Sequence, residues 1–454
     1  MEDNEKLVYT FSDFNDEEIK VFLPKFEIDM GTMRQIKDMS KDLILKHIRI
    51  MPDCHRGAGC CVGMTAQIQN RIYPRYVGFD IGCGISIYPF NVELTEESIP
   101  VIEKIIQKHV PMGSGEKGKN RQLQMLDSDW DYLREINNAD LEFLKVKLAE
   151  KYPDYKFPEI IDKDYVTDMI KKIGNLNNDL KSIGTLGGGN HYVEVNKGDS
   201  TEKYLTVHSG SRNIGASICK FHQDIIDNNS RFDYDAFKDE MKNVKRKFKD
   251  SKIIHEIEME LRNKMTDELH PRYLEDHEMI DYLIDMIVGQ NLASLNRIIM
   301  IRNVIKNVPQ EFLSDSATTH DFDPSKVIET KHNYIDFKRF MLRKGSISAE
   351  KGEQCVVSLN MRDGILLCEG KGNPDWNYSS AHGCGRILKR GSVNKLSMSQ
   401  FREEMKGVYS TSVRKETLDE SPMAYRNVDL VKRCLKESVV ILKQLKPIIN
   451  CKGF

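Results

Sequence analysis

The stretch RYVGFDIGCGISIY, residues 75–88, gives the strongest indication of how this chain folds. Glycines alternate there with short runs of β-branched and aromatic residues, a pattern typical of strands joined by tight turns. The same texture returns in IGTLGGGNHYVEV (183–195), in YLTVHSGSRNIG (204–215) and across residues 326–395. Because these blocks lie far apart in the sequence, we expect a β-sheet core assembled from distant segments.

Helical patterns separate these strand blocks. Residues 95–180 are charged, poor in glycine and carry Leu and Ile at helical spacing, and residues 218–307 are helical in pattern almost throughout. The stretch VDLVKRCLKESVVILKQL, residues 428–445, also predicts a helix. We therefore expect an α+β fold, with a mixed β-sheet core flanked by helices and an active site in a central cleft. The predicted domains are a body of residues 1–217 and 308–454 and an inserted helical hairpin or subdomain of residues 218–307.

Composition is that of a soluble globular protein. Of the 454 residues, 40% are hydrophobic and 30% are charged, and no apolar run approaches the length of a membrane span. The acidic start MEDNEKLVYTFSDF lacks an apolar signal core, so we expect a cytoplasmic protein with no membrane partner. The ten cysteines form no CxxC pair, which favours packing roles for most of them. With a net charge of −2, a nucleic-acid partner requires a local basic face.

Potential metal ligands stand next to glycine or asparagine in several strand blocks. The polar residues of these blocks are Asp80, Cys83, Asn190, His191, Glu194, His208, Ser209, Arg212, His332 and Asn333. Taken singly, Asp80 could cap a turn, Cys83 could pack in the core and His208 could be a hydrogen-bonded core histidine. Taken together, carboxylate, thiolate and imidazole are the usual ligands of transition metals. Five candidates (Asp80, Cys83, His191, His208 and His332) suit two ions bridged by Cys83, and both zinc and manganese fit this set.

A further histidine lies in NYSSAHGCGRILKR, residues 377–390. His382 is surrounded by Ser, Ala, Gly and Cys, so packing alone does not account for it. Small neighbours leave room for a large group to reach the ring and expose backbone N–H groups to it. A tight glycine turn without function is the alternative explanation of this stretch.

Nine stretches in this order resemble the RtcB family of RNA-splicing ligases, and the resemblance runs from about residue 25 to the C-terminus. The stretches are MPDCHRGAG (51–59), GFDIGCGI (78–85), GTLGGGNHYVEV (184–195), VHSGSRNIG (207–215), KHN (331–333), RKGS (343–346), SSAHGCGR (379–386), DESPMAYRNVD (419–429) and CKG (451–453). The chain departs from the family in SLNMRDG (358–364), where PGSMG is usual, and in having Cys384 for alanine and Ile365 for a contact serine. We expect these departures to alter the nucleotide pocket and to leave the histidine chemistry unchanged.

The resemblance implies a GTP-dependent RNA ligase with two Mn²⁺ ions. It implies that RNA with a 3′-phosphate or 2′,3′-cyclic phosphate is joined to a 5′-hydroxyl end, through a covalent histidine–GMP intermediate at His382 and an activated RNA(3′)pp(5′)G end. The substrates implied are tRNA halves or damaged ribosomal RNA, in tRNA splicing or RNA repair, with archease as a candidate activating partner. Asp80, Cys83 and His191 would hold one ion, and Cys83, His208 and His332 the other.

The resemblance also implies a set of nucleotide-binding residues. They are Asn190, His191, Tyr192, Val193, Glu194, His332, Asn333, Ser358, Leu359, Asn360, Met361, Gly383, Cys384, Gly385, Tyr425 and Lys452. Glu194 is the candidate that accepts hydrogen bonds from guanine N1–H and N2–H₂, and Lys452, on a tail that we expect to be helical, is a candidate contact to the nucleotide. A neutral imidazole is a competent nucleophile near pH 7, which suits His382.

The RNA needs cationic side chains near the site. The candidates are Arg212, Arg343 with Lys344, Arg386 with Lys389 and Arg390, and the run Lys242 to Lys252, whose alternative is a solvated helix face. The alternative function is a dinuclear metal-dependent phosphoesterase acting on RNA, because the same ligands serve hydrolases. A non-catalytic RNA-binding protein has no use for the ligands together with His382.

Overall fold

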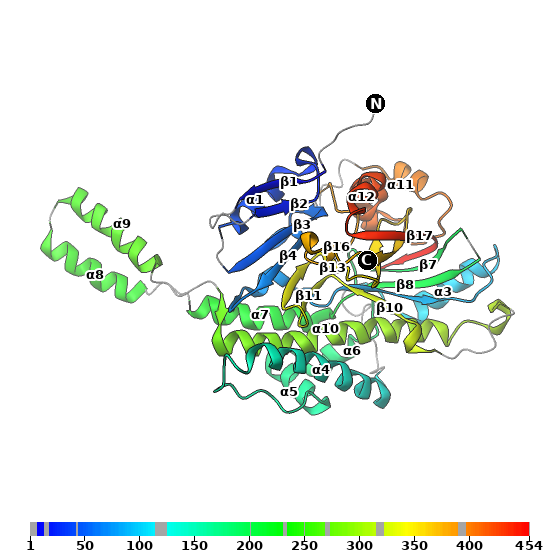
Figure 1. The fold of residues 1–454 in the computed structure, drawn as a ribbon, viewed down its shortest axis with the longest axis horizontal. Helices are drawn as coiled ribbons and strands as arrows, with labels where there is room; N and C mark the ends of the chain where they lie inside the picture. Colours follow the sequence, from blue (N-terminus) through cyan, green and yellow to red (C-terminus); the bar gives the residue numbers. More distant parts are fainter. Residues whose placement is uncertain are drawn as a thin grey trace.

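Two β-sheets and a set of helices form the body of the chain in the computed structural model (Figure 1). The structure describes residues 7–12, 18–41, 44–113, 125–199, 201–229, 234–248, 250–267, 273–314, 322–388 and 396–453. The predicted mixed α+β architecture is confirmed.

The first sheet has six strands in the order β1-β2-β3-β4-β12-β11. Their bounds are β1 (Tyr9–Ser12), β2 (Glu18–Val21), β3 (Leu45–His55), β4 (Val62–Ile68), β12 (Met341–Lys344) and β11 (Asn333–Asp336). All neighbours are antiparallel except β2 and β3, which run parallel. The sheet therefore joins the first 70 residues to a segment near residue 340.

The second sheet has seven antiparallel strands in the order β10-β6-β8-β7-β17-β15-β14. Their bounds are β10 (Ile328–Lys331), β6 (Gly84–Pro89), β8 (Lys203–Ser209), β7 (Tyr192–Lys197), β17 (Val439–Lys452), β15 (Ile365–Gly370) and β14 (Gln354–Ser358). Its two ends approach each other, because the backbone N–H of Val356 on β14 donates to Thr330 Oγ1 on β10 at 3.0 Å. The sheet is thus nearly closed into a barrel.

The chain crosses between the sheets at points that carry candidate site residues. His332 separates β10 from β11, and Gly345 separates β12 from β13 (Ser346–Ser348). β13 pairs with β16 (Ser379–Ala381), which ends one residue before His382. These crossing points form the seam between the two sheets. A second two-stranded sheet, β5 (Arg71–Ile72) with β9 (Leu274–Glu275), is separate from both large sheets.

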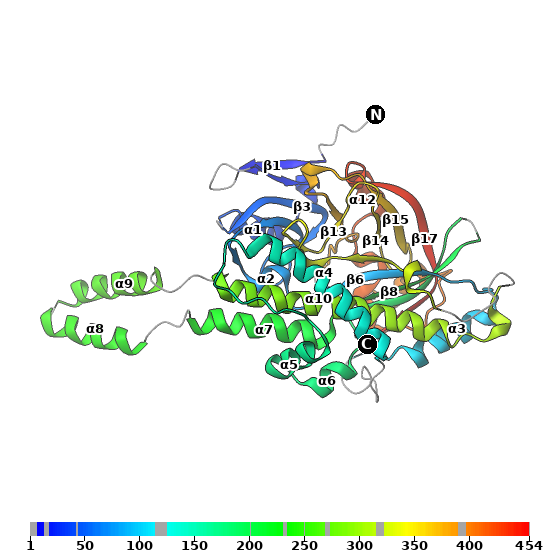
Figure 2. The ribbon, with the colours of Figure 1, turned by 60° about the horizontal axis from the view of Figure 1, so that its bottom comes forward.

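The longest helices of the body lie on one side of the sheets (Figure 1). The α-helices are α1 (Met30–Met39), α2 (Pro74–Val77), α3 (Ser98–His109), α4 (Asp127–Leu148), α5 (Lys163–Ile173), α6 (Leu176–Lys181), α7 (Arg212–Asn229), α8 (Tyr234–Lys247), α9 (Ser251–Asp267), α10 (Asp276–Ile305), α11 (Met398–Glu404) and α12 (Val428–Leu435). Figures 1 and 2 both show α10 between α4 and α7, against the sheets. Most side chains of α10 are buried, as expected for a helix that is apolar on all sides. Its Arg302 pairs with Asp129 of α4 at 2.6 Å.

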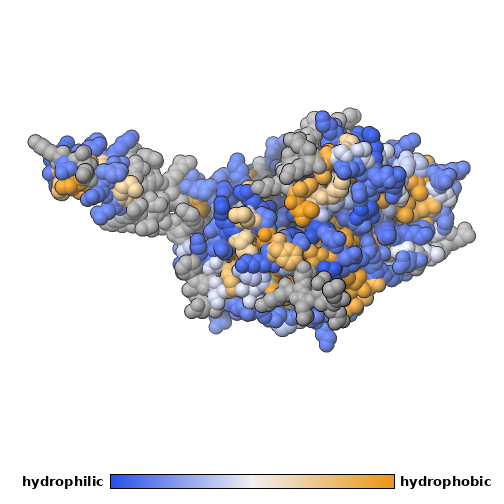
Figure 3. Space-filling view, turned by 90° about the horizontal axis from the view of Figure 1, so that it is seen from above, coloured by the Kyte–Doolittle hydropathy of each residue, from blue (hydrophilic) through white to orange (hydrophobic). Residues whose placement is uncertain are grey.

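The hairpin of α8 and α9 stands away from the body (Figure 1). Seen from above, it projects again, and the body face beside it carries both hydrophilic and hydrophobic residues (Figure 3). The helices predicted across residues 218–307 are therefore present, and they divide into a projecting pair and the buried α10. The predicted domain boundaries stay a prediction. Among the described helices, none combines the length and the apolar character that a membrane crossing requires.

The predicted helix over residues 428–445 is wrong in its second half. α12 ends at Leu435, and β17 begins at Val439 and continues to Lys452. Val439, Val440 and Ile441 favour a strand, and β17 finds partners on both edges, β15 and β7. Lys452 therefore lies at the buried C-terminal end of a strand and not on a helical tail.

Candidate functional site

The predicted metal ligands meet at the seam between the two sheets. Asp80 and Cys83 lie on one turn before β6, in which the Cys83 N–H donates to Asp80 O at 3.2 Å. Gly82 within this turn has a φ of +68°, and a Cβ there would lie 2.6 Å from Gln290 Cα of α10. Only glycine allows the turn to pack this closely on the helix.

Cys83 and three histidines form one cluster. Cys83 Sγ lies 3.5 Å from His191 Nε2 and 3.4 Å from His208 Nε2, and His332 Nε2 lies 3.4 Å from His208 Nε2. All four side chains are buried. Cys83, His191 and His208 form a group whose donor atoms all lie within 4.8 Å of one another, which a metal ion could occupy.

The protonation of His191 fits a cation at this position. Its Nδ1 lies 3.0 Å from Leu186 O, a carbonyl that can only accept, so Nδ1 carries the proton. In the neutral ring, Nε2 then presents a lone pair to Asp80 Oδ2 at 2.9 Å. Two lone pairs at this distance repel unless a cation or a second proton lies between them.

Electrostatics also favour neutral imidazoles. Burial, together with the charges of neighbouring histidines, lowers the pKa of His208 and His332 well below 6.5. Burial and then the charge of Asp80 raise the pKa of the Cys83 thiol well above 9.0, so a metal ion is needed to hold it as thiolate. Burial opposes the ionised form of Asp80, but the charge of His191 outweighs it and lowers the pKa of that carboxyl to about 2.

His382 adjoins this cluster. Its ring centroid lies 4.6 Å from that of His332. Nδ1 of His382 lies 2.5 Å from Asp53 Oδ2 and 2.8 Å from Gly345 O. Both partners are acceptors, so Nδ1 carries the proton and Nε2 is the nitrogen left for chemistry.

Asp53, at the end of β3, organises the loop that carries His382. Its Oδ2 also accepts from the backbone N–H groups of His382 at 3.1 Å and Gly383 at 3.0 Å. Burial favours neutral His382, but the charge of Asp53 outweighs it and raises the pKa of the ring above 6.5. One carboxylate therefore fixes both the loop and the ring.

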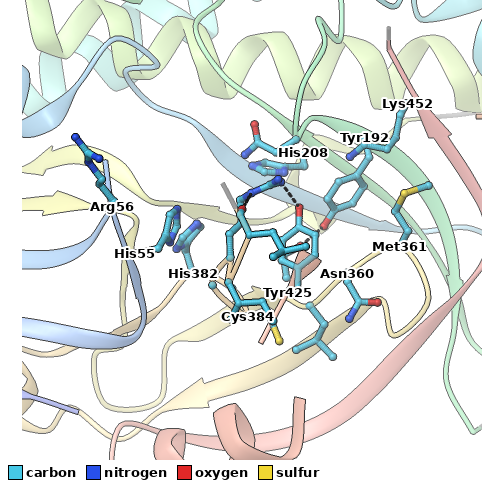
Figure 4. A pocket seen from close by; sticks show the side chains of 18 of the residues that line it. His55, Arg56, Tyr192, His208, Asn360, Met361, His382, Cys384, Tyr425 and Lys452 are labelled. Atoms are coloured by element: carbon cyan, nitrogen blue, oxygen red, sulfur yellow. Dashed lines mark hydrogen bonds between the residues drawn. The ribbon is translucent and has the colours of Figure 1, made fainter. Parts of the chain in front are cut away.

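His382 opens on a cavity of about 400 Å³ (Figure 4). Many of the predicted nucleotide-binding residues line it: Asn190, Tyr192, Glu194, Ser358, Leu359, Asn360, Met361, Gly383, Cys384, Gly385, Tyr425 and Lys452. His208 also lines it, so the cavity touches the ligand cluster. The altered segment 358–361 forms part of its wall.

Four residues predicted to bind the nucleotide do not line this cavity: His191, Val193, His332 and Asn333. His191 and His332 belong to the ligand cluster instead. Val193 points to the other face of β7 and packs in a hydrophobic core with Val195 and Val207. Asn333 connects two turns at the seam: its Nδ2 donates to Asp80 O, and its Oδ1 accepts from the Gly345 N–H.

Glu194 is held by two buried amides. Asn196 Nδ2 donates to its Oε2 at 2.8 Å, and Asn450 Nδ2 donates to its Oε1 at 2.7 Å. Burial raises the pKa of Glu194 to about 7, although these hydrogen bonds and the charge of Lys452 oppose the shift. A buried carboxylate that points into a cavity is suited to a ligand that donates hydrogen bonds.

A charged network around Glu420 adjoins the same end of the cavity as Glu194. Tyr425 donates to its Oε2 at 2.5 Å, Arg386 donates to its Oε1 at 2.9 Å, and Lys452 Nζ lies 3.5 Å from Oε2. These contacts fix Tyr425 and Lys452 at the cavity wall. Arg386 lines the cavity as well.

Two of the predicted RNA-binding residues have other partners. Arg343 is fully buried and donates to Asp336 and Tyr334, and Lys344 donates to the carbonyls of Ala58 and Arg75. The prediction that they hold RNA phosphates is therefore wrong. Arg212 begins α7 with a φ of 57° and lies against Gly187. Lys389 and Arg390 lie outside the described residues.

Sequence reasoning missed one end of the cavity. Asp29, His55 and Arg56 line it, and Asp53 accepts a hydrogen bond from the backbone of His382 beside it. The signal was present in MPDCHRGAG, where an Asp and a His stand two residues apart before a glycine-rich turn.

Comparisons of the sequence with known proteins identify similar chains. The family model described as tRNA-splicing ligase RtcB matches residues 35–453. An RNA-splicing ligase RtcB of Escherichia coli K12 is 25% identical, over 96% of this chain and 97% of its own length. The tRNA-splicing ligases RtcB of Methanococcus maripaludis (25% identical) and Nanoarchaeum equitans (24%) each align over 90% of this chain, and over 88% and 89% of their own lengths.

Proposed function

We propose an RNA-ligase function on this premise: the chain belongs to the RtcB family of tRNA-splicing ligases. The reaction is the joining of an RNA 3′-phosphate or 2′,3′-cyclic phosphate end to a 5′-hydroxyl end, with GTP and two Mn²⁺ ions, in tRNA splicing or RNA repair. The observation that carries the proposal is His382, anchored through Nδ1 and set between the Cys/His cluster and a nucleotide-sized cavity.

The first step is guanylylation of His382. Nε2 attacks the α-phosphorus of GTP, the N–P bond forms, and pyrophosphate leaves. Asp53 supports this step by keeping the proton on Nδ1 and by stabilising the positive charge that the ring acquires. The backbone N–H groups of the small-residue loop are available to the phosphate oxygens.

The residues that would hold the two ions are Asp80, Cys83 and His191 for one, and Cys83, His208 and His332 for the other. The neutral imidazoles and the lone pairs facing each other at His191 and Asp80 fit this assignment. A bound divalent ion supplies charge stabilisation to phosphoryl oxygens.

Glu194 selects the base in this proposal. Its carboxylate accepts from guanine N1–H and N2–H₂, a pattern that adenine cannot offer, and the two asparagines hold its orientation. Replacing Glu194 with Ala is expected to lose the preference for GTP over ATP in adduct formation. Full retention of that preference would contradict the assignment.

The later steps use the same site. An oxygen of the RNA 3′-phosphate bonds to the guanylate phosphorus and releases His382, which gives the RNA(3′)pp(5′)G end. The 5′-hydroxyl oxygen then bonds to the 3′ phosphorus and GMP leaves. A 2′,3′-cyclic phosphate is first opened by water. The proposal also places the protein in the cytoplasm and names archease as its activating partner.

The test is incubation of the protein with α-labelled GTP and Mn²⁺, with His382→Ala and, as a control histidine outside the site, His109→Ala on α3. We expect an acid-labile labelled protein in the wild type and His109→Ala, no label in His382→Ala, and loss of label when the metal is chelated. Release of cleaved RNA with no labelled protein would support the phosphoesterase instead.

A further inference from the structure

One end of the cavity has no role in the steps above. His55, Arg56 and Asp29 line it, whereas Glu194, Asn360 and Lys452 line the nucleotide end. Figure 4 shows His55 beside His382, with Arg56 next to it, on the side away from Lys452 and Met361. His382 therefore stands between the nucleotide end and a second end of the same cavity, where Arg56 is the cationic side chain.

The protonation of His55 is fixed by Asp53, two residues before it in the chain. Its Nδ1 lies 3.0 Å from the backbone carbonyl of Asp53, which can only accept. Nδ1 therefore carries the proton, and Nε2 holds a lone pair. The same residue thus orders both rings, that of His382 through its carboxylate and that of His55 through its carbonyl.

The surroundings of His55 keep it neutral before substrate binds. Burial lowers its pKa to about 4; the hydrogen bond to Asp53 O opposes this shift, and the charges of His382 and Arg386 reinforce it. Asp53 is the anionic group that acts on the ring, and Asp29 and Arg56 are the other charged groups at this end of the cavity. A bound RNA phosphate raises the pKa of a nearby imidazole toward neutrality.

We propose that His55 is a catalytic residue of the sealing step, with Nε2 accepting the proton of the RNA 5′-hydroxyl while Arg56 pairs with the first phosphate of that strand. This inference rests on the proposed ligase function. The 5′-oxygen forms a bond to the 3′ phosphorus, the bond from that phosphorus to the guanylate oxygen breaks, and GMP departs. The hydroxyl proton passes to Nε2 of His55 and from there to solvent.

The experiment separates the three steps in the full-length protein. Labelled GTP measures guanylylation, a 3′-phosphate oligonucleotide measures transfer of GMP, and an oligonucleotide with a preformed ppG end plus a 5′-hydroxyl strand measures sealing alone. The main variant is His55→Asn, whose amide keeps a donor at the position of Nδ1 and lacks the atom corresponding to Nε2. His55→Ala is the second variant, and His109→Ala is the matched control.

We expect sealing by His55→Asn and His55→Ala to fall about 100-fold or more, the usual contribution of a general base. Guanylylation and GMP transfer should stay within about threefold of wild type, and the rate of sealing by His55→Asn should rise with pH across the range where the wild type is flat. Equal losses in all three steps, or normal sealing, would overturn the role of His55. A wild type that forms no adduct would instead overturn the ligase function itself.

Discussion

The pKa of Glu194 predicts how stability depends on pH at a single residue. The folded pKa is about 7 and the ordinary value is 4.5, so the folded state holds the proton more tightly than the unfolded state. The contribution of Glu194 to the free energy of unfolding is fully present below pH 4.5 and is lost as the pH rises through 7. The loss is about 3 kcal/mol at 1.4 kcal/mol per pH unit.

Glu194→Gln removes that dependence. Gln cannot ionise, and any cost of reorienting the Asn450 amide, whose Oδ1 has no hydrogen-bond partner in the described structure, is independent of pH. The difference in free energy of unfolding, variant minus wild type, should therefore increase by about 3 kcal/mol between pH 4.5 and pH 8, measured by urea denaturation. Glu369→Gln, at an exposed position of β15, is the control and should show no such trend. Parallel pH profiles for Glu194→Gln and wild type would contradict the raised pKa.

Individual site residues were predictable from the sequence where they stand in a glycine-rich motif. Cys83, His191, His208 and His382 each stand within two residues of a glycine, in stretches that otherwise favour strands, and the structure brings them together. Asp53 has a local signal in MPDCHRGAG, but its contact with the His382 loop was not predictable from that stretch. Its function depends on a loop 329 residues away, and no local pattern encodes such a contact.

At the scale of elements, the turn between β12 and β13 sets the position of His382. Gly345 has a φ of +58°, and its carbonyl accepts from His382 Nδ1. A Cβ at this position would lie 2.1 Å from Val62 Cγ1 and 3.2 Å from His382 Cε1. Gly345→Ala should therefore lower the free energy of unfolding by about 3 kcal/mol, from backbone strain plus the clash.

The control for this variant is Gly352→Ala. Gly352 has a φ of +78°, and a Cβ there would have no atom within 4 Å, so only the backbone cost of about 1 kcal/mol is expected. Guanylylation should drop more than tenfold in Gly345→Ala and stay normal in Gly352→Ala, measured with labelled GTP. Equal effects of both substitutions would show that the packing of this turn does not control His382.

The elements differ in how readily the sequence predicts them. α10, which is long and apolar, and β6, which follows Gly82, were both predicted. The prediction of a strand before Gly78 is wrong, because Pro74–Val77 form helix α2. β17 was assigned to a helix, because its lysines and apolar residues fit either period over a short window. The choice is made by pairing with β7, from Lys446↔Lys197 to Lys452↔Tyr192, and with β15, from Ile365↔Leu445 to Gly370↔Val439, and both of these strands lie far away in the sequence.

At the scale of the whole molecule, the site depends on the seam between two sheets. His332 lies at the passage from one sheet to the other, His382 follows a strand that pairs across it, and Cys83 precedes a strand of the second sheet. Because both sheets must form before these side chains meet, the site and the body are expected to fold as one unit. α10 belongs to that unit, because its residues fill the largest core.

The hairpin of α8 and α9 projects from this unit (Figure 1). Within the described residues, α8 packs chiefly against α9, and its buried side chains Phe237, Met241 and Val244 lie on one helix face. Replacing residues 230–272 with about 12 glycine and serine residues, which can span up to roughly 40 Å, should therefore leave the body intact. We expect the unfolding midpoint to change little and guanylylation to stay within about twofold of wild type. Removing residues 218–307 instead should prevent folding, because it removes α10 from the core. A hairpin deletion that fails to fold, with circular dichroism and solubility as the measurements, would show that the inserted unit is part of the body after all.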